Sequence, residues 1–262
     1  MALVALVFLA PVILMLLTSF KTSGEVLNPS TIIPHPWSLA GYAKVLKYSE
    51  ESPMGLWLLN SLLVSTSVTF LVLLFSSMSA FAIARLRVKG AGKIITLIVV
   101  SMMIPGQLFL IPVYLILNWL RWLDTPLALI VPATAGGFGV FMLTQFMKSI
   151  PPSLEEAAVI DGCGLWRIYW EICLPLVAPA MATLGIFTFI GSWNDFLGPL
   201  VYMDSVRSYT LPVGIALYQS SYVSEYSLTL AASALGTAPL IVVFIILQKQ
   251  IVASMATSGL KD

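Results

Sequence analysis

The residues best placed for chemistry are carboxylates in one polar stretch that separates two long apolar runs. The stretch reads Pro151-Pro152-Ser153-Leu154-Glu155-Glu156-Ala157-Ala158-Val159-Ile160-Asp161-Gly162. Its acids, Glu155, Glu156 and Asp161, can make charge-assisted hydrogen bonds with basic side chains of another protein. Ala157 and Ala158 have small side chains that let such a surface approach closely. The stretch is therefore suited to binding another protein. The simpler alternative is an ordinary interfacial helix between two apolar segments.

The same stretch predicts a short helix with a defined start and end. Ser153 followed three residues later by Glu156 forms a capping-box pattern, in which each side chain satisfies a backbone N–H of the first turn. Gly162 ends the helix, because glycine readily adopts the left-handed conformation of a helix terminus. The expected order is a stop at Pro151–Pro152, a helix over Leu154–Ile160, a terminator at Gly162, a second short helix over Leu165–Ile172 and a new helix opened by Pro175.

A second candidate site is Trp193-Asn194-Asp195, at the end of an apolar run. Asp195 is the only acid at the edge of such a run, and ionisable groups there are functional candidates. An aromatic face, an amide and a carboxylate together suit a ligand rich in hydroxyl groups, such as a sugar. Alternatively, Asn194 and Asp195 cap the helix end while Trp193 anchors it in the lipid headgroup region.

The sequence contains no phosphate-binding loop for a nucleotide. A phosphate-binding loop of the form G-x-x-x-x-G-K-[ST] wraps backbone N–H groups around the phosphates. The nearest candidate, Gly92-Lys93, has Arg87 where the first glycine is needed and Ile94 where serine or threonine is needed. We therefore expect no ATP hydrolysis by this chain, no catalytic residue and no cofactor of its own.

Metal binding is not expected either. The single histidine is His35, and the two cysteines are Cys163 and Cys173. Zinc needs several of these ligands to converge, and their spacing here matches no known metal motif.

The elements that must position these residues are membrane helices. Apolar residues make up 59% of the chain and charged residues 10%, whereas a soluble domain carries about 25% charged residues. The net charge of +1 gives no basic face for nucleic acid. A helix needs about 20 apolar residues to cross a bilayer. Six uncharged runs of at least that length predict an all-α integral membrane protein with transmembrane helices at Met1–Phe20, Ser52–Ala84, Ile94–Leu120, Thr125–Met147, Ile172–Asn194 and Tyr226–Gln248.

The first run has a competing interpretation as a cleaved signal peptide. It lacks a basic leading region and a small-residue cleavage pattern, and it exceeds the usual apolar length of about 7–15 residues. We expect a first transmembrane helix, with an N-terminus that could be truncated.

Glycine and proline mark special positions inside two runs. Pro105 in the third run predicts a kink, since proline removes a backbone hydrogen bond. Gln107 beside it would face a translocation path or would hold neighbouring helices together by hydrogen bonds. Gly136, Gly137 and Gly139 in the fourth run are expected to allow close helix packing.

Basic residues in short loops predict the orientation in the membrane. Arg85, Arg87, Lys89 and Lys93 crowd one connection, which is therefore expected on the cytoplasmic side. An even number of spans then places both termini and the polar stretch at 151–162 on that side.

Four segments of the sequence resemble one known family. The polar stretch and its sequel read E-A-A, three residues, G, nine residues, I-x-L-P, from Glu156 to Pro175. This pattern is similar to the cytoplasmic coupling loop in permease subunits of bacterial ABC importers. Gly191–Leu200 and Thr210–Gly214 resemble the carbohydrate-uptake branch, in particular the maltose-type "G" permease, and the tail Gln248–Asp262 is similar too.

The resemblance implies a type I importer permease fold in the bacterial inner membrane. It implies the following partners: a second homologous permease, two copies of an ATPase that carries the ATP and magnesium, a periplasmic or lipid-anchored solute-binding protein, and membrane lipid. The expected domains are a first transmembrane helix at 1–20, a periplasmic loop at 21–55, a five-helix core at 56–250 with the coupling loop at 151–175, and a cytoplasmic tail at 251–262. A short helix is expected within the periplasmic loop, at Leu39–Tyr48.

Three other functions compete with a sugar importer. An intramembrane enzyme needs a catalytic pair in the bilayer, and Asp195 stands alone. A secondary transporter usually has coupling acids at mid-membrane and internal repeats, which we do not find. A permease for glycerol 3-phosphate or another polyol phosphate would look alike, but no span carries the Arg or Lys that a phosphate favours. The substrate itself is not specified by the sequence.

Overall fold

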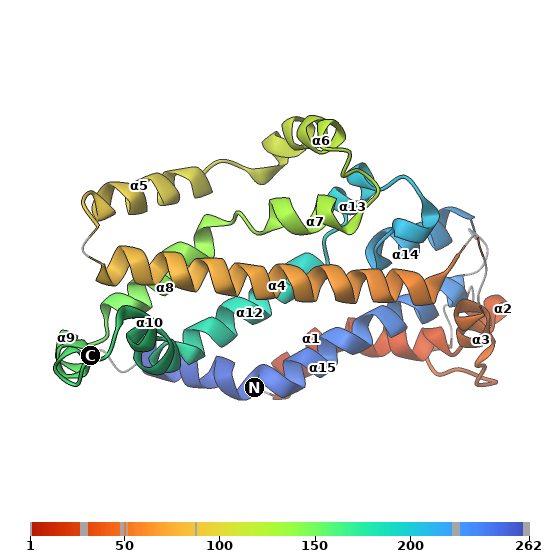
Figure 1. Ribbon diagram of the computed structural model, residues 1–262. Helices are drawn as coiled ribbons and strands as arrows, with labels where there is room; N and C mark the ends of the chain where they lie inside the picture. The colour runs from red at the N-terminus through yellow and green to blue at the C-terminus, as the bar shows by residue number, and fades with distance from the viewer. Residues whose placement is uncertain are drawn as a thin grey trace. The chain divides into compact units, whose positions relative to one another are not determined.

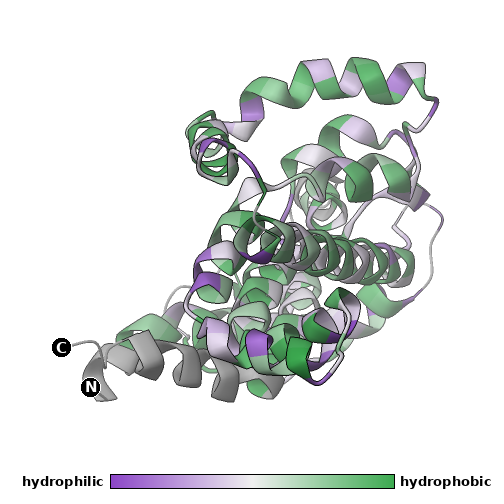
Figure 2. Cartoon of the chain, turned by 60° about the vertical axis from the view of Figure 1, so that its left-hand side comes forward, coloured by the Kyte–Doolittle hydropathy of each residue, from purple (hydrophilic) through white to green (hydrophobic). Residues whose placement is uncertain are grey.

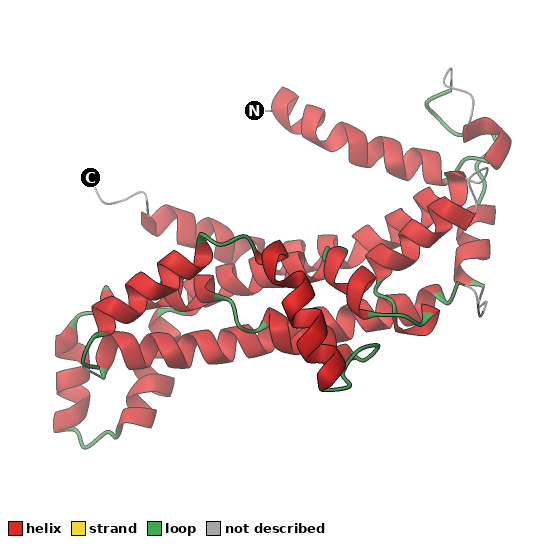
Figure 3. Cartoon of the chain, turned by 90° about the horizontal axis from the view of Figure 1, so that it is seen from above, coloured by secondary structure: helices red, strands yellow, loops and turns green. Residues whose placement is uncertain are grey.

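The computed structural model describes residues 2–26, 31–47, 50, 52–86, 88–221 and 226–258. Within these residues the chain is nearly all helical and contains no strand, as predicted (Figure 3). The elements, most of which are labelled in Figure 1, are α1 (Ala2–Ser19), α2 (Ser23–Val26), α3 (Ala40–Leu46), α4 (Met54–Arg85), α5 (Ala91–Met102), η1 (Gly106–Phe109), α6 (Leu110–Trp119), α7 (Pro126–Ala133), α8 (Gly137–Lys148), α9 (Pro152–Ile160), α10 (Leu165–Arg167), η2 (Ile168–Cys173), α11 (Leu174–Leu176), α12 (Ala178–Trp193), α13 (Leu197–Tyr202), η3 (Val206–Ser208), α14 (Leu211–Ser221) and α15 (Tyr226–Ser258).

The helices form two compact units. The first comprises residues 1–63, 124–126 and 194–242, and the second comprises residues 64–123, 127–193 and 243–262. The boundaries fall inside α4 and α15, so each of these long helices contributes to both units. The polar stretch at 151–162 belongs to the second unit, whereas Asp195 belongs to the first.

The six predicted spans all coincide with apolar helices. Two are single helices long enough to cross a membrane, namely α4 and the Tyr226–Ile245 part of α15. Three are pairs of helices with a bend of 87° between α5 and Gly106–Trp119, 40° between α7 and α8, and 75° between Leu165–Leu176 and α12. The first span corresponds to α1, in which the part searched, Val7–Ser19, is a mostly apolar helix shorter than a full span.

The predicted kink in the third span is confirmed. Helix α5 ends at Met102, and the chain resumes at Gly106 as the 3-10 turn η1 before α6 begins. Pro105 lies at this break with ψ of 126°, outside the helical range. The loss of its N–H donor explains why the helix stops here.

The bend at the start of the fifth span corrects a prediction. Pro175 does not open this span but lies within the short helix α11, and the spanning helix α12 begins only at Ala178. Proline is tolerated in α11 because the first turn of a helix needs no N–H from it. The bend therefore follows Pro175 instead of preceding it.

Helix α15 extends beyond the predicted last span into the predicted C-terminal tail. Residues 251–258 of the predicted tail continue α15, and residues 259–262 lie outside the described part of the chain. The short helix predicted at Leu39–Tyr48 is confirmed as α3.

In the first unit, the start of α4 packs tightly against α14. Trp57 is fully buried, and its indole Nε1–H donates to the backbone oxygen of Val206 at 2.6 Å. A Cβ added at Gly214 would lie 2.1 Å from the Trp57 ring. Only glycine fits at this crossing.

In the second unit, α8 packs against both α5 and α12. The predicted packing role of the glycines holds at two of the three positions. A Cβ at Gly139 would lie 2.5 Å from Ser76 Oγ, and one at Gly137 would lie 2.9 Å from Ile98. Gly136 has no neighbour within 4 Å of such an atom.

Hydrophobic residues make up much of the length of the helices (Figure 2), and large apolar side chains are exposed on them. Phe70 is 65% exposed, Leu97 69% and Ile111 71%. Soluble proteins rarely expose contiguous apolar surface on this scale. These side chains need lipid or another membrane subunit around them.

Candidate functional site

Helix α9, which carries the candidate coupling residues, starts earlier than predicted. It spans Pro152–Ile160, and the residue before it, Pro151, makes no side-chain capping bond. Ser153 therefore lies inside the first turn and not at the cap, so the predicted capping box with Glu156 is wrong. Pro152 favours this start because its fixed φ suits the first helical position and its missing N–H is not needed there.

The predicted end of α9 is confirmed. Gly162 has φ of +80°, a conformation that only glycine adopts without strain. Two hydrogen bonds close the helix: the N–H of Gly162 donates to Val159 O at 3.0 Å, and that of Cys163 donates to Ala158 O at 2.9 Å. A Cβ at Gly162 would meet nothing within 4 Å, so the requirement for glycine is conformational.

Helix α9 exposes one face and buries another. Ala158 is buried, while Ala157, Glu156 and Asp161 are exposed. Ile160 at the exposed end is 86% accessible. A short helix with small, apolar and acidic groups on its open side presents a surface suited to another protein.

Glu155 differs from its neighbour Glu156. Its Oε1 lies 2.8 Å from Arg85 Nε, and the two side chains are only 20% and 9% exposed. Among the described residues the Nε–H has no hydrogen-bond partner, so this contact is an ion pair by proximity. The thiol of Cys173 lies 3.7 Å from the same carboxylate oxygen. Sequence reasoning missed this pairing, because Arg85 and Glu155 lie far apart in the chain.

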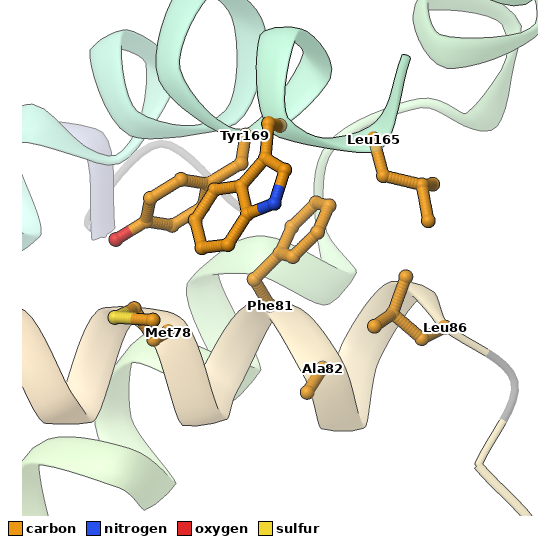
Figure 4. Close-up of a pocket in the computed structure, with 7 residues that line it drawn as sticks. Met78, Phe81, Ala82, Leu86, Leu165 and Tyr169 are labelled. Atoms are coloured by element: carbon orange, nitrogen blue, oxygen red, sulfur yellow. The ribbon is translucent and has the colours of Figure 1, made fainter.

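The second half of the loop is an unusual helix that packs on α4. Residues Ile168–Cys173 form a π-helix, η2, between α10 and α11. Its Tyr169 is buried and shares a 2.8 Å hydrogen bond with Ser77 of α4. Close by lies an apolar hollow of about 270 Å³, shown in Figure 4 and lined by Met78, Phe81, Ala82, Leu86, Leu165, Trp166 and Tyr169.

The residues of the second candidate site do not share one exposed surface. Trp193 is 3% exposed and stacks on Phe189, with ring centroids 5.7 Å apart. Asn194 and Asp195 are exposed. Oδ1 of Asp195 accepts the N–H of Gly198 at 3.3 Å, in the manner of a cap for α13.

Gln107, the remaining candidate, is exposed within η1 at the break of the third span. Its exposed side chain could contact a neighbouring helix or the translocation path, and both roles stay predictions.

A polar cluster that sequence reasoning missed surrounds Asp124. Its Oδ1 accepts from the N–H of Asp204 (3.2 Å), the N–H of Ser205 (3.1 Å) and the hydroxyl of Ser205 (3.0 Å). Partial burial of the carboxyl opposes ionisation, but these hydrogen bonds and one involving Ser208 outweigh it and lower the pKa of Asp124. The carboxylate thus fixes one loop against another within the first unit.

The geometry defines a class: a helical membrane protein of broken apolar spans with an exposed helix in one loop. Residues 53–257 match the family model described as the inner membrane component of binding-protein-dependent transport systems. The chain belongs to this family and is a permease subunit of an ABC importer, without catalytic activity of its own.

Named relatives align over almost the whole chain. It is 33% identical to the arabinooligosaccharides transport system permease protein AraQ of Halalkalibacterium halodurans, over 99% of this chain and 94% of the relative. It is 36% identical to the sulfoquinovosyl glycerol transport system permease protein SmoH of Agrobacterium fabrum, over 97% and 89%.

The fold recurs in a solved structure. A chain of a bacterial ABC transporter for import of the acidic polysaccharide alginate matches with a TM-score of 0.82 and 21% identity, over 95% of this chain and 93% of that one. The predicted type I importer permease fold is confirmed.

Proposed function

We propose that this chain is one permease of an ATP-driven importer for a sugar or oligosaccharide. Relatives that align end to end carry names of saccharide transport systems, and the fold matches that of a polysaccharide importer. One six-span subunit forms half of a translocation path. A second, homologous permease supplies the other half.

The observation that carries the coupling role is the exposed face of α9. Glu156, Ala157, Asp161 and Gly162 lie open to solvent within a loop whose spacing matches the family's coupling pattern. A separate ATPase, present in two copies, binds this face and holds ATP and magnesium. Closure of the ATPases then moves α9 and switches the path between inward and outward openings.

The topology follows from the basic residues of the short loops. The coupling loop at 151–175 lies in the cytoplasm, and so do both termini. A periplasmic or lipid-anchored binding protein delivers substrate on the other side. Asn194, Asp195 and Gln107 are exposed candidates for contact with the substrate along the path, and Trp193, which is buried and stacks on Phe189, is the fourth candidate.

Copurification tests the coupling role. Glu156→Ala and Gly162→Ala are expected to lower retention of the ATPase by the solubilised permease, because the first removes an exposed charge and the second strains a left-handed position. Ser153→Ala is the matched control, since Ser153 lies on the same helix and makes no cap bond. Intact ATPase binding and coupled hydrolysis in both test variants would refute the proposal.

Uptake with the complete importer tests the substrate class. We expect accumulation of at least one of arabinotriose, maltotriose and diacetylchitobiose in proteoliposomes. Glycerol 3-phosphate in the same panel tests the polyol-phosphate alternative. Uptake of that compound alone would replace the sugar assignment.

A further inference from the structure

Arg85 joins three elements of the second unit. It is the last residue of α4, and its Nη2 donates to the backbone oxygens of Met147 (2.6 Å) and Ile150 (2.7 Å). Met147 lies in the last turn of α8, where helix C=O groups lack partners within the helix, and Ile150 follows in the link between α8 and α9. Nε of the same guanidinium contacts Glu155 of α9. One side chain therefore connects the end of α4, the end of α8 and the first turns of α9.

A second contact attaches the coupling loop to α4 at another position along that helix. Ser77 lies eight positions before Arg85, which is about 12 Å along a helix. Its hydroxyl bonds to Tyr169 of η2, and both residues are buried. Phe81, halfway between, contacts the Tyr169 ring with centroids 5.2 Å apart. Figure 4 shows Phe81 and Tyr169 among the residues that line the apolar hollow.

We infer that Glu155 and Arg85 are positioning residues that make the coupling loop a rigid extension of α4. Two contacts about 12 Å apart prevent the loop from pivoting about either one. A displacement of α9 is thereby passed to α4 and α8 instead of being absorbed by the loop. The inference rests on the proposed coupling function. It assigns different roles to the two neighbouring acids: Glu156 contacts the partner ATPase, and Glu155 holds α9 to the helices of this chain.

Burial distinguishes this ion pair from an ordinary surface pair. Pairs between exposed side chains are screened by water and contribute little. Arg167 and Glu171, in the same loop, form such a pair at 2.9 Å, with side chains 63% and 58% exposed. At Arg85 and Glu155 the surrounding protein excludes most water, and removal of one partner leaves the other charge uncompensated.

The test uses the complete importer, purified with its partner subunits and placed in proteoliposomes. Two quantities are measured: retention of the ATPase, and the ratio of ATP hydrolysis with and without binding protein. The binding protein is loaded with the saccharide of the above panel that it binds best. For Glu155→Gln we expect unchanged retention and a stimulation ratio lowered about fivefold or more.

Three further variants separate positioning from general damage. Glu171→Gln removes the exposed pair of the same loop and is expected to leave both quantities unchanged. Arg85→Lys keeps the charge but lacks the fork that reaches α8 and α9 together, so an intermediate ratio is expected. Ser77→Ala removes the second contact by a small change and is expected to lower the ratio without loss of the ATPase.

Each result has a defined consequence. An unchanged ratio in Glu155→Gln overturns the inference, and if that variant does not assemble, an unchanged ratio in Ser77→Ala does so. Loss of the ATPase from Glu155→Gln would make Glu155 a direct partner contact, which overturns the inference and leaves the proposed function standing. Failure of the proposed function is recognised separately, by intact coupling in the Glu156 and Gly162 variants.

Discussion

Asp124 illustrates how one residue can fix a loop. It adopts a left-handed backbone with φ of 59°, which asparagine and aspartate tolerate better than most residues. Its backbone N–H donates to Tyr202 O at 2.9 Å. Its carboxylate accepts three hydrogen bonds from Asp204 and Ser205, which follow Tyr202 in the chain. The hydrogen bonds favour the charged form, so folding and ionisation are linked.

This linkage predicts a pH dependence of stability. The native pKa of Asp124 lies below its ordinary value of 3.8, so the stabilisation is fully present above that value and is lost as the pH falls through the lowered native pKa. Asp124→Asn keeps the left-handed preference and removes the charge. Its unfolding midpoint, measured in detergent by intrinsic fluorescence, is expected to depend less on pH below about 4 than that of the wild type. Equal pH dependence would contradict the role of the charge.

A neighbouring control separates this carboxylate from the general effect of acid. Asp204 is exposed, and its side chain is not part of the Asp124 contacts. Asp204→Asn should therefore leave the midpoint and its pH profile unchanged. Asp124→Ala, which leaves the donors of Ser205 without their acceptor, is expected to cost about 1–3 kcal/mol at neutral pH.

Asp195 admits two roles that different variants distinguish. As a cap it needs only an acceptor for the N–H of Gly198, whereas a sugar contact in the path would also use its charge. If it contacts sugar, Asp195→Asn and Asp195→Ala are both expected to alter uptake or substrate preference in the panel. If it only caps α13, Asp195→Ala lowers thermal stability and Asp195→Asn is silent in both assays.

At this scale the sequence predicts local conformation better than partners. The left-handed position of Gly162 could be predicted because glycine and helix termination are local properties. The contact of Glu155 with Arg85 depends on the packing of distant helices, so the sequence placed Glu155 on the partner surface. The predicted capping box was wrong because it placed the helix start at Ser153. The helix begins one residue earlier, at Pro152, which is favoured at the first helical position.

Among the elements, α8 depends on glycine where it crosses α4. A Cβ at Gly139 would meet Ser76 Oγ at 2.5 Å and Leu184 Cδ2 at 3.0 Å. Gly139→Val is therefore expected to force the helices apart and to destabilise the second unit by about 1–3 kcal/mol. Thermal unfolding of the solubilised permease measures the effect.

Gly136 provides the matched control for this prediction. It precedes α8 in an extended conformation, and a Cβ there meets nothing within 4 Å. Gly136→Val should leave the unfolding midpoint close to that of the wild type. A similar loss in both variants would indicate that flexibility of the segment matters, not the helix crossing.

The spans themselves were predictable because apolar length is a property of composition. All six runs fell on helices, including the span that breaks at Pro105. The bends of 40° and 75° in the next two spans were missed. Breaks inside membrane helices depend on neighbouring groups that satisfy the freed backbone, and a single sequence does not display those neighbours.

For the whole molecule, the exposed apolar side chains and the topology predict which surfaces meet lipid, a partner subunit and the cytoplasm. Side chains such as Leu97 and Ile111 are exposed on this chain, and under the proposed function we expect lipid and a second permease to cover them. The orientation then determines which surfaces reach the cytoplasm. Ile160, 86% exposed at the end of α9, is expected inside the cell, and Arg207, exposed in η3, is expected outside.

Cysteine labelling in intact cells tests that orientation. With Cys163 and Cys173 replaced by alanine, Arg207→Cys is expected to react with a membrane-impermeant maleimide before lysis. Ile160→Cys should react only after the membrane is permeabilised. The basic cluster that follows α4 predicts a cytoplasmic loop there, and the loop that carries α9, two spans further along the chain, is then expected on the same side. The reverse pattern would invert the molecule and place α9 out of reach of any ATPase. Reaction at position 160 in permeabilised cells should also fall when the ATPase is co-expressed, since the same exposed face is then covered.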